Sequence, residues 1–137
     1  MLRATFILLL VVELFAANTG RVFAQNEVAG TLKKWQPVTL TFAGPECSET
    51  GSLNPFTEYR LDVTFQKGDR TYRVPGYFAA DGNAAETSAT SGRTWRVHFM
   101  PDDVGQWKYR ASFRKGDRVA VADNITAGEP SDFDGAN

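Results

Sequence analysis

Cysteine and histidine are nearly absent from this chain of 137 residues, which contains one of each. Cys47 has no second cysteine to pair with, so no disulfide can form within the chain and stability has to come from buried apolar side chains. His98 is a single histidine, whereas a zinc site needs three or four converging ligands. A cysteine nucleophile would need a histidine partner, and these two residues lie on different predicted segments. The composition therefore predicts no cofactor and no thiol catalysis.

An excess of positive charge is also lacking. The chain has 15 lysines and arginines against 16 aspartates and glutamates, which leaves a formal net charge of −1. The basic residues form no run along the sequence. Such a balance does not favour binding to nucleic acid or to an anionic membrane surface.

One long apolar run is present, and it lies at the N-terminus. Arg3 supplies a positive charge, the following apolar stretch is broken only by Glu13, and the segment ends at Ala24 after small or β-branched residues. This pattern predicts a secretory signal peptide over residues 1–24. A membrane anchor is the weaker alternative, because an apolar stretch of about 14 residues is shorter than the roughly 20 that cross a bilayer. We therefore expect a secreted or periplasmic protein with no membrane span after signal removal.

Apolar and polar residues alternate through most of the remaining chain, which is the two-residue period of a half-buried β-strand. Tyr59, Leu61 and Val63, for example, point to one face of their segment, and no window shows a helical period. The segments with this pattern are 38–42, 59–65, 70–78, 94–99 and 106–113, with a weaker one at 118–125. The sequence therefore predicts an all-β fold, specifically an immunoglobulin-like antiparallel β-sandwich.

Turn-forming residues separate these segments. Two near-identical Lys-Gly-Asp sequences, at 67–69 and 115–117, are predicted to form tight hairpins because glycine tolerates positive φ. Two longer stretches, 43–57 and 79–93, are predicted loops, and loops of this length in a small domain usually have a function or pack against another element.

The stretch PDDVGQWKY, residues 101–109, contains two adjacent carboxylates. Catalysis by a pair of carboxylates needs two groups that converge on a substrate, and neighbouring residues in a turn rarely face one another. We therefore interpret Asp102 and Asp103 as part of a corner between two strands, in which Gly105 relaxes the backbone and Trp107 enters the core.

Asp81, Asn83 and Glu86 are the strongest candidates for a metal site, because their oxygens are spaced along one loop. A calcium loop of the common type requires 12 positions and more carboxylates. Metal binding is therefore the weaker hypothesis here, and a structured loop that docks on a following domain is the stronger one.

The three tryptophans divide into two groups. Trp95 and Trp107 follow the period of the apolar strand residues, so we expect them in the core, where each would bury a large apolar area. Trp35 opens its strand beside polar residues, and Tyr77 and Phe78 follow a proline and a glycine. These last three are the candidate contacts with a carbohydrate or with a partner domain.

The segments WQPVTLTF, PGYF and WRVHFMPDDVGQWKY together resemble a bacterial family designated domain of unknown function 5060. The resemblance covers roughly residues 30–127. It implies an immunoglobulin-like domain that follows a signal peptide and precedes a TIM-barrel region similar to glycoside hydrolases. It implies no catalytic residues in this domain.

The resemblance leads to an expected domain order: a signal peptide at 1–24, a polar lead-in at 25–34, the sandwich at 35–127, and a linker or the start of a further strand at 128–137. The expected function is that of a non-catalytic accessory domain, an N-terminal piece of a secreted glycoside-hydrolase-like protein. Its partner would be a downstream TIM barrel in the same polypeptide. Two alternatives stay open: a carbohydrate-binding module with a polysaccharide ligand, and a cell-surface adhesion or interaction domain.

Overall fold

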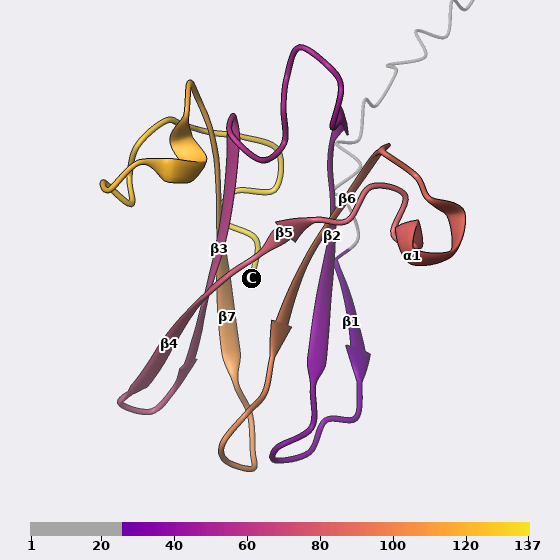
Figure 1. The fold of residues 1–137 in the computed structure, drawn as a ribbon. Coiled ribbons are helices and arrows are strands. Elements are labelled where there is room, and N and C mark those ends of the chain that lie inside the picture. The colour runs from indigo at the N-terminus through magenta and orange to yellow at the C-terminus, as the bar shows by residue number, and fades with distance from the viewer. Residues whose placement is uncertain (1–25) are drawn as a thin grey trace, which may run out of the picture.

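The computed structural model describes residues 26–137, so the predicted signal peptide at 1–24 lies outside the described residues. Eight strands form two four-stranded antiparallel sheets (Figure 1). The strands are β1 (Glu27–Gly30), β2 (Val38–Ser48), β3 (Tyr59–Lys67), β4 (Arg70–Pro75), β5 (Tyr77–Phe78), β6 (Ser91–Phe99), β7 (Lys108–Lys115) and β8 (Glu129–Pro130). Two short helical turns, α1 (Ala84–Thr87) and η1 (Val119–Val121), lie between strands. The predicted all-β fold with two antiparallel sheets is confirmed.

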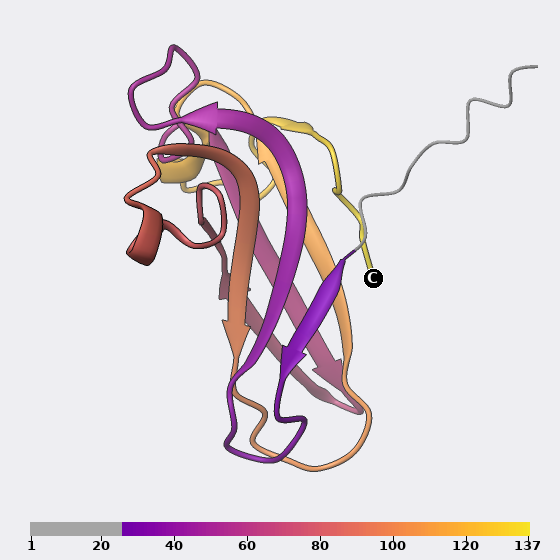
Figure 2. The same cartoon turned by 90° about the vertical axis from the view of Figure 1, so that its right-hand side faces the viewer.

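The strands are ordered β1-β2-β6-β5 in the first sheet and β4-β3-β7-β8 in the second. Figure 2 shows the two sheets as layers with long loops at either end. The chain changes sheet between β2 and β3, between β4 and β5, and between β6 and β7. The β4–β5 change takes place through the single residue Gly76, whereas the other two connections are loops at the ends of the sandwich.

The core lies between the sheets and is built by the alternating residues of β2, β3, β6 and β7. Val63, Val97 and Phe113 have no exposed surface. Aromatic rings join the layers: Phe65 of β3 stacks on Phe99 of β6 with 4.1 Å between ring centroids. Trp95 of β6 meets Phe113 of β7 edge to face at 4.8 Å. Burying a side chain of this size contributes roughly 1.5–3 kcal/mol, so these rings supply much of the stability of a domain without disulfides.

The structure corrects the sequence predictions in two segments and decides between two possibilities in a third. The polar lead-in contains a strand, β1, which pairs with β2 from Glu27↔Thr41 to Gly30↔Val38. The weak strand expected at 118–125 is wrong: η1 lies there, and Arg118 before it has a φ of +50°. Of the two possibilities left open for 128–137, the structure has the further strand, because β8 pairs with β7 at Lys115↔Glu129.

Phe133 explains why the C-terminal tail stays on the sandwich. Its ring is buried and stacks on Phe113 at 4.2 Å and on Phe42 at 4.7 Å. The Asp134 carboxylate also accepts the Phe113 N–H at 2.7 Å. A single phenylalanine in a polar tail has no periodic pattern, so the sequence did not reveal this contact.

The predicted loops are shorter than expected. β2 continues to Ser48, with an irregular register between Ala43 and Cys47, so only the second half of the predicted loop at 43–57 is a loop. In the loop predicted at 79–93, α1 forms a single turn and β6 begins at Ser91.

The two Lys-Gly-Asp turns differ in structure. The first is a tight hairpin between β3 and β4, and Gly68 has a φ of +57° as predicted. The second is not a hairpin: β7 ends at Lys115 and the chain enters η1, with the positive φ at Arg118 instead of Gly116. Identical turn residues thus take the conformation that the following segment allows.

Among residues 26–137, no helix has the length and apolar character needed to span a membrane.

Phe133→Ala is expected to lower the free energy of unfolding by about 3–5 kcal/mol, because it removes a ring from a packed aromatic stack. Phe56→Ala is the matched control, since Phe56 is 53% exposed. We expect it to lower the free energy of unfolding by about 1 kcal/mol or less. Urea denaturation followed by tryptophan fluorescence measures both. Equal losses in the two variants would show that the tail does not belong to the folded core.

Candidate interdomain contact surface

Exposed large apolar side chains gather at one end of the sandwich. Five of them lie on β1 and on the loops 31–37 and 100–106, and we call them the loop-end patch: Val28, Leu32, Trp35, Met100 and Val104. Their exposed fractions range from 50% to 75%. Scattered exposed apolar residues are ordinary, but a group of them on neighbouring loops marks a surface that contacts something else.

Trp35 is held in this exposed position by its own backbone. Its N–H donates to the carbonyl oxygen of Pro101 at 2.8 Å, which ties the two loops together. Its φ is +61°, a conformation that costs a bulky residue about 1–3 kcal/mol. The Lys34 ammonium lies 5.3 Å from the centroid of the indole ring. The structure therefore presents this ring to solvent.

The corner at 101–109 is fixed by the β3–β4 hairpin. The Lys67 ammonium donates to the Asp103 carboxylate at 2.6 Å, and Lys67 also donates to the Val104 carbonyl. The Tyr72 hydroxyl donates to Asp102 at 2.7 Å. The two carboxylates thus hold a corner, as the sequence analysis proposed, instead of facing each other across a substrate site.

These contacts change the acidity of the groups involved. Hydrogen bonding to the Lys67 ammonium, assisted by the Val104 N–H, holds the pKa of Asp103 below its usual range. The hydrogen bond to the Asp102 carboxylate raises the pKa of the Tyr72 hydroxyl. Both shifts favour the protonation states that maintain the corner at neutral pH.

Trp107 closes the corner over the core. Its indole N–H donates to the Asp103 carbonyl at 3.2 Å, and its ring meets Phe99 edge to face at 5.1 Å. The side chain is half-buried, whereas Trp95 is 2% exposed. The prediction that these two tryptophans pack in the core holds fully for Trp95 and partly for Trp107.

An apolar groove of about 350 Å³ runs beside the loop-end patch, between β1 and β7. Its inner wall consists of core residues, among them Leu40, Phe65 and Phe99. Trp107 and Tyr109 border it on the β7 side, and Val28 and Leu32 border it on the β1 side. The groove therefore lies directly over the core along this edge of the sandwich.

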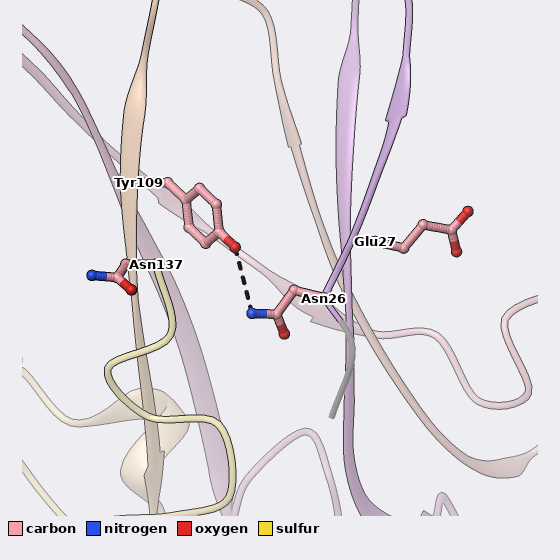
Figure 3. Close-up of a pocket in the computed structure, with 4 residues that line it drawn as sticks. All are labelled: Asn26, Glu27, Tyr109 and Asn137. Carbon is pink, nitrogen blue, oxygen red and sulfur yellow. Dashed lines mark hydrogen bonds between the residues drawn. The ribbon is translucent and has the colours of Figure 1, made fainter. Parts of the chain in front are cut away.

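Tyr109 lies at the centre of the same opening. Figure 3 shows its ring projecting from β7 toward β1, with the Asn26 amide donating to the Tyr109 hydroxyl at 3.4 Å. Glu27 points away from the opening, and Asn137 lies on the other side of Tyr109 (Figure 3). These four residues line a shallow hollow of about 690 Å³. Polar contacts across the gap are thus limited to one long hydrogen bond among the residues described.

Tyr77 and Phe78, which the sequence grouped together, have opposite environments. Tyr77 is 43% exposed on the outer face of the first sheet, and its hydroxyl lies 2.9 Å from Nε2 of His98. His98 Nδ1 in turn lies 2.9 Å from the Thr39 hydroxyl. Phe78 is 7% exposed and packs against Trp95 at 5.3 Å, so it is unavailable to a partner. Adjacent residues of a strand point to opposite faces, which explains the difference.

Both carboxylate oxygens of Asp81 form hydrogen bonds within the 81–87 turn. One Asp81 oxygen accepts the Asn83 N–H at 2.8 Å, and the other accepts the Thr87 hydroxyl at 2.7 Å. The hydrogen bond from Thr87, with that from Asn83, lowers the pKa of Asp81. No group of three histidine, cysteine, aspartate or glutamate side chains suited to a metal occurs within residues 26–137. Asp81 therefore organises the turn that carries α1, which favours the structured-loop interpretation.

Cys47 is buried and far from the histidine. Burial raises the pKa of its thiol, although a hydrogen bond with Tyr59 opposes this, and a raised pKa disfavours the reactive thiolate. Cys47 pairs with Gly92 whereas Thr39 pairs with His98, so the two lie about 20 Å apart along β6 at 3.3 Å per residue. The sequence analysis placed Cys47 in a loop, whereas it lies in β2 and its side chain packs in the core.

Sequence reasoning found Trp35 but missed the other members of the loop-end patch. Leu32 and Val104 are isolated apolar residues in polar stretches, and Met100 directly follows the last strand residue Phe99, so none of the three carries a periodic signal of its own. These residues are recognised as a patch only by the exposure of their side chains, and this exposure is known only from the folded structure.

A family model described as Domain of unknown function (DUF5060) matches residues 31–114, which is more than half of the chain. The chain belongs to this family. The matched region of the DUF5060 domain contains Trp35, the corner at 101–109 and most of the core strands.

A solved structure from Bacteroides vulgatus, described as a candidate glycoside hydrolase, is 28% identical to this DUF5060 domain. The TM-score is 0.44, and the match covers 61% of this chain and 13% of that chain. The domain thus spans a small part of the length of that protein. No curated protein matches the chain.

Asp103→Asn is expected to destabilise the domain at pH 6–7 and to have a much smaller effect at acidic pH. Because the pKa of Asp103 is lowered in the folded state, the stability it adds is present above about pH 4, the unfolded value, and is lost as pH falls through the lower folded value. Urea denaturation from pH 2.5 to pH 7 measures the difference. Asp117→Asn, in the second Lys-Gly-Asp turn, is the control and is expected to show no such pH dependence. A pH-independent loss in Asp103→Asn would contradict the ion-pair explanation.

Proposed function

We propose that this DUF5060 domain is a non-catalytic accessory domain of a larger secreted protein, and that its loop-end patch contacts a glycoside-hydrolase-like catalytic domain in the same polypeptide. The domain order expected from the family resemblance motivates the proposal. The observation that carries it is the concentration of exposed apolar side chains on the loops 31–37 and 100–106. Contacts between domains of one chain are typically moderate in area, so a patch of this kind suits such a contact.

The rigidity of the patch supports a contact role. Trp35 is tied to Pro101, and the corner that carries Val104 is tied to Lys67 and Tyr72 through its two aspartates. A surface that is ordered before binding loses less conformational entropy when a partner docks. If the loop 100–106 only connected β6 to β7, it would not need the hydrogen bonds that Lys67 and Tyr72 form with its two aspartates.

The carboxylates that the sequence singled out have structural roles, which supports a domain without catalytic function of its own. Asp81 organises the turn before α1, and Asp102 and Asp103 hold the corner through Tyr72 and Lys67. A general acid must instead donate a proton to a bound substrate, and a general base must accept one from it.

We also infer that the sandwich is of the immunoglobulin class. In that class one sheet has the strand order A-B-E-D, and the other contains C, F and G with an additional strand next to C in some members. If β1 to β8 are labelled A, B, C, C′, D, E, F and G, the first sheet, β1-β2-β6-β5, has the order A-B-E-D. The second sheet, β4-β3-β7-β8, then has the order C′-C-F-G, so both sheets match the immunoglobulin class. Secretion belongs to the same proposal and rests on the signal-peptide pattern of residues 1–24.

The accessory role is tested in the full-length parent protein. Leu32→Asp combined with Val104→Asp is expected to weaken the coupling between the domains by about 2 kcal/mol, because charges replace apolar side chains in the contact. Calorimetry measures whether the two domains unfold together, and hydrolysis of a polysaccharide measures activity. In the single domain the same double variant is expected to leave stability within about 0.5 kcal/mol of the wild type.

Ile125→Asp is the matched control, because Ile125 is 54% exposed but lies outside the patch. It is expected to leave the coupling unchanged. If the double variant unfolds and hydrolyses like the wild type, the loop-end patch is not the contact. If deletion of the whole domain also leaves stability and activity unchanged, the accessory role itself is refuted.

Carbohydrate binding is the second candidate, and two observations favour it: Trp35 is 57% exposed and Tyr77 is 43% exposed. Aromatic rings that face solvent can stack on sugars. The burial of Trp95 and the partial burial of Trp107 argue against an extended row of binding tryptophans.

Titration of the isolated domain with a panel of soluble polysaccharides separates the two candidates. The accessory role predicts no change in tryptophan emission. A saturable shift that disappears in Trp35→Ala would favour the carbohydrate-binding module. A shift that disappears in Tyr77→Ala alone would place the sugar on the outer face of the first sheet.

A further inference from the structure

The second sheet has an incomplete edge. β7 pairs with β3 along its whole length, from Tyr59↔Lys115 to Gln66↔Lys108. On its other side β7 pairs with β8 only at Arg114 and Lys115. Toward the loop-end patch, β7 has no strand partner on this side among the residues that the structure describes.

The C-terminal tail continues partway along this edge after β8. The Ser131 N–H donates to the Phe113 carbonyl at 3.0 Å. Further along, the Gly135 N–H donates to the Ala111 carbonyl at 2.9 Å, and the Ala111 N–H donates to the Ala136 carbonyl at 2.8 Å. The tail thus runs antiparallel to β7 and forms backbone hydrogen bonds with Phe113 and Ala111 of that strand.

Tyr109 is the next residue of β7 in this alternation. In an antiparallel ladder every second residue directs its N–H and C=O to the same side, so those of Tyr109 point to the open edge. No described residue forms a hydrogen bond with its backbone there. An edge of this kind is a template for an added strand.

The side chains along the edge favour such a strand. Tyr109 and Trp107 border the apolar groove of about 350 Å³, whose inner wall includes Leu40, Phe65 and Phe99. A strand paired with β7 would place every second side chain on the same face as Tyr109 and thus into the groove. Its remaining side chains would point outward beside Lys108 and Arg110, which are exposed.

We propose that the residues following Asn137 in the parent polypeptide complete this edge as an extended strand along β7 and fill the apolar groove. The inference rests on the proposed function only in requiring a longer polypeptide. Asn137 borders both the hollow at Asn26 and a second hollow formed by β3 and β7 residues, so the tail reaches the unpaired part of β7 at Tyr109. Figures 2 and 3 show this end of the chain beside β7 and close to the start of β1. A strand that continues directly from the tail needs no connecting loop. It therefore avoids the conformational entropy that a more distant segment would lose when its connecting loop is closed.

The following strand would form the physical connection between this domain and its neighbour. Since it borders Leu32 and Val104 across the groove, it would also contribute to the surface around the loop-end patch. The register predicts that the first and third residues after Asn137, opposite Tyr109 and Trp107, are apolar. Charged residues at both positions would overturn the proposal.

Amide hydrogen exchange tests the strand directly. The chain ending at Asn137 is compared with the same chain extended by the natural residues that follow, about ten of them, since these span roughly 33 Å in a strand. In the shorter chain the Tyr109 amide is expected to exchange rapidly while that of Ala111 is protected. In the extended chain the protection of Tyr109 is expected to rise at least about 100-fold, and the Trp107 emission is expected to shift to shorter wavelength.

A control extension carries proline at its first and third added positions, because proline removes the N–H groups that would pair with β7. It is expected to leave Tyr109 unprotected. Unchanged exchange of Tyr109 in the natural extension, or equal protection by the proline control, would overturn the proposal. Protection of Tyr109 in the shorter chain that grows with protein concentration would assign the edge to a second copy and would also overturn it.

The extension contains no catalytic domain, so this result is independent of the contact made by the loop-end patch. Protection of Tyr109 together with unchanged coupling in the Leu32 and Val104 double variant would refute the proposed docking surface alone. Loss of coupling in that variant without protection of Tyr109 would refute the strand alone.

Discussion

Aromatic packing between two sheets is the interaction on which the rest of this structure depends. Phe65 stacks on Phe99 near one end of the core, and Trp95 meets Phe113 near the other. No disulfide is available to replace this packing, because the chain has a single cysteine. The free energy gained by burying these rings has to offset the conformational entropy of the whole domain, and this explains why even the polar C-terminal tail contributes a phenylalanine, Phe133.

The rigid layers determine where the loops lie and what they can do. The loop 31–37 precedes β2 and the loop 100–106 follows β6, and β2 and β6 are antiparallel neighbours. The two loops therefore come together at the same end of the sandwich although they are far apart in sequence. Hydrogen bonds from Trp35, Lys67 and Tyr72 then convert them into one ordered surface. Polar groups that resemble catalytic residues in the sequence are used here to position apolar ones. This division of roles is consistent with a domain whose work is contact with a neighbour.

The same frame explains the open edge at β7. The tail follows β7 as far as Ala111 and leaves Tyr109 beside the groove. The loop-end patch and the open edge border the same apolar groove, so a neighbouring domain and the strand that leads to it would complete one continuous surface. The described residues of the DUF5060 domain thus leave the apolar groove and the adjoining edge of β7 uncovered.

The sequence by itself determined the elements with a strong period: β2, β3, β6, β7 and the burial of Trp95. It also identified the first Lys-Gly-Asp hairpin and the corner at 101–109. These succeeded because a half-buried strand requires alternation, and because turn residues act locally. Only the tertiary structure decided the rest: β1 and β8, the burial of Phe78 and Phe133, and the grouping of Leu32, Met100 and Val104. Each of these depends on contacts between distant segments, and such contacts leave no periodic trace in the residues that make them.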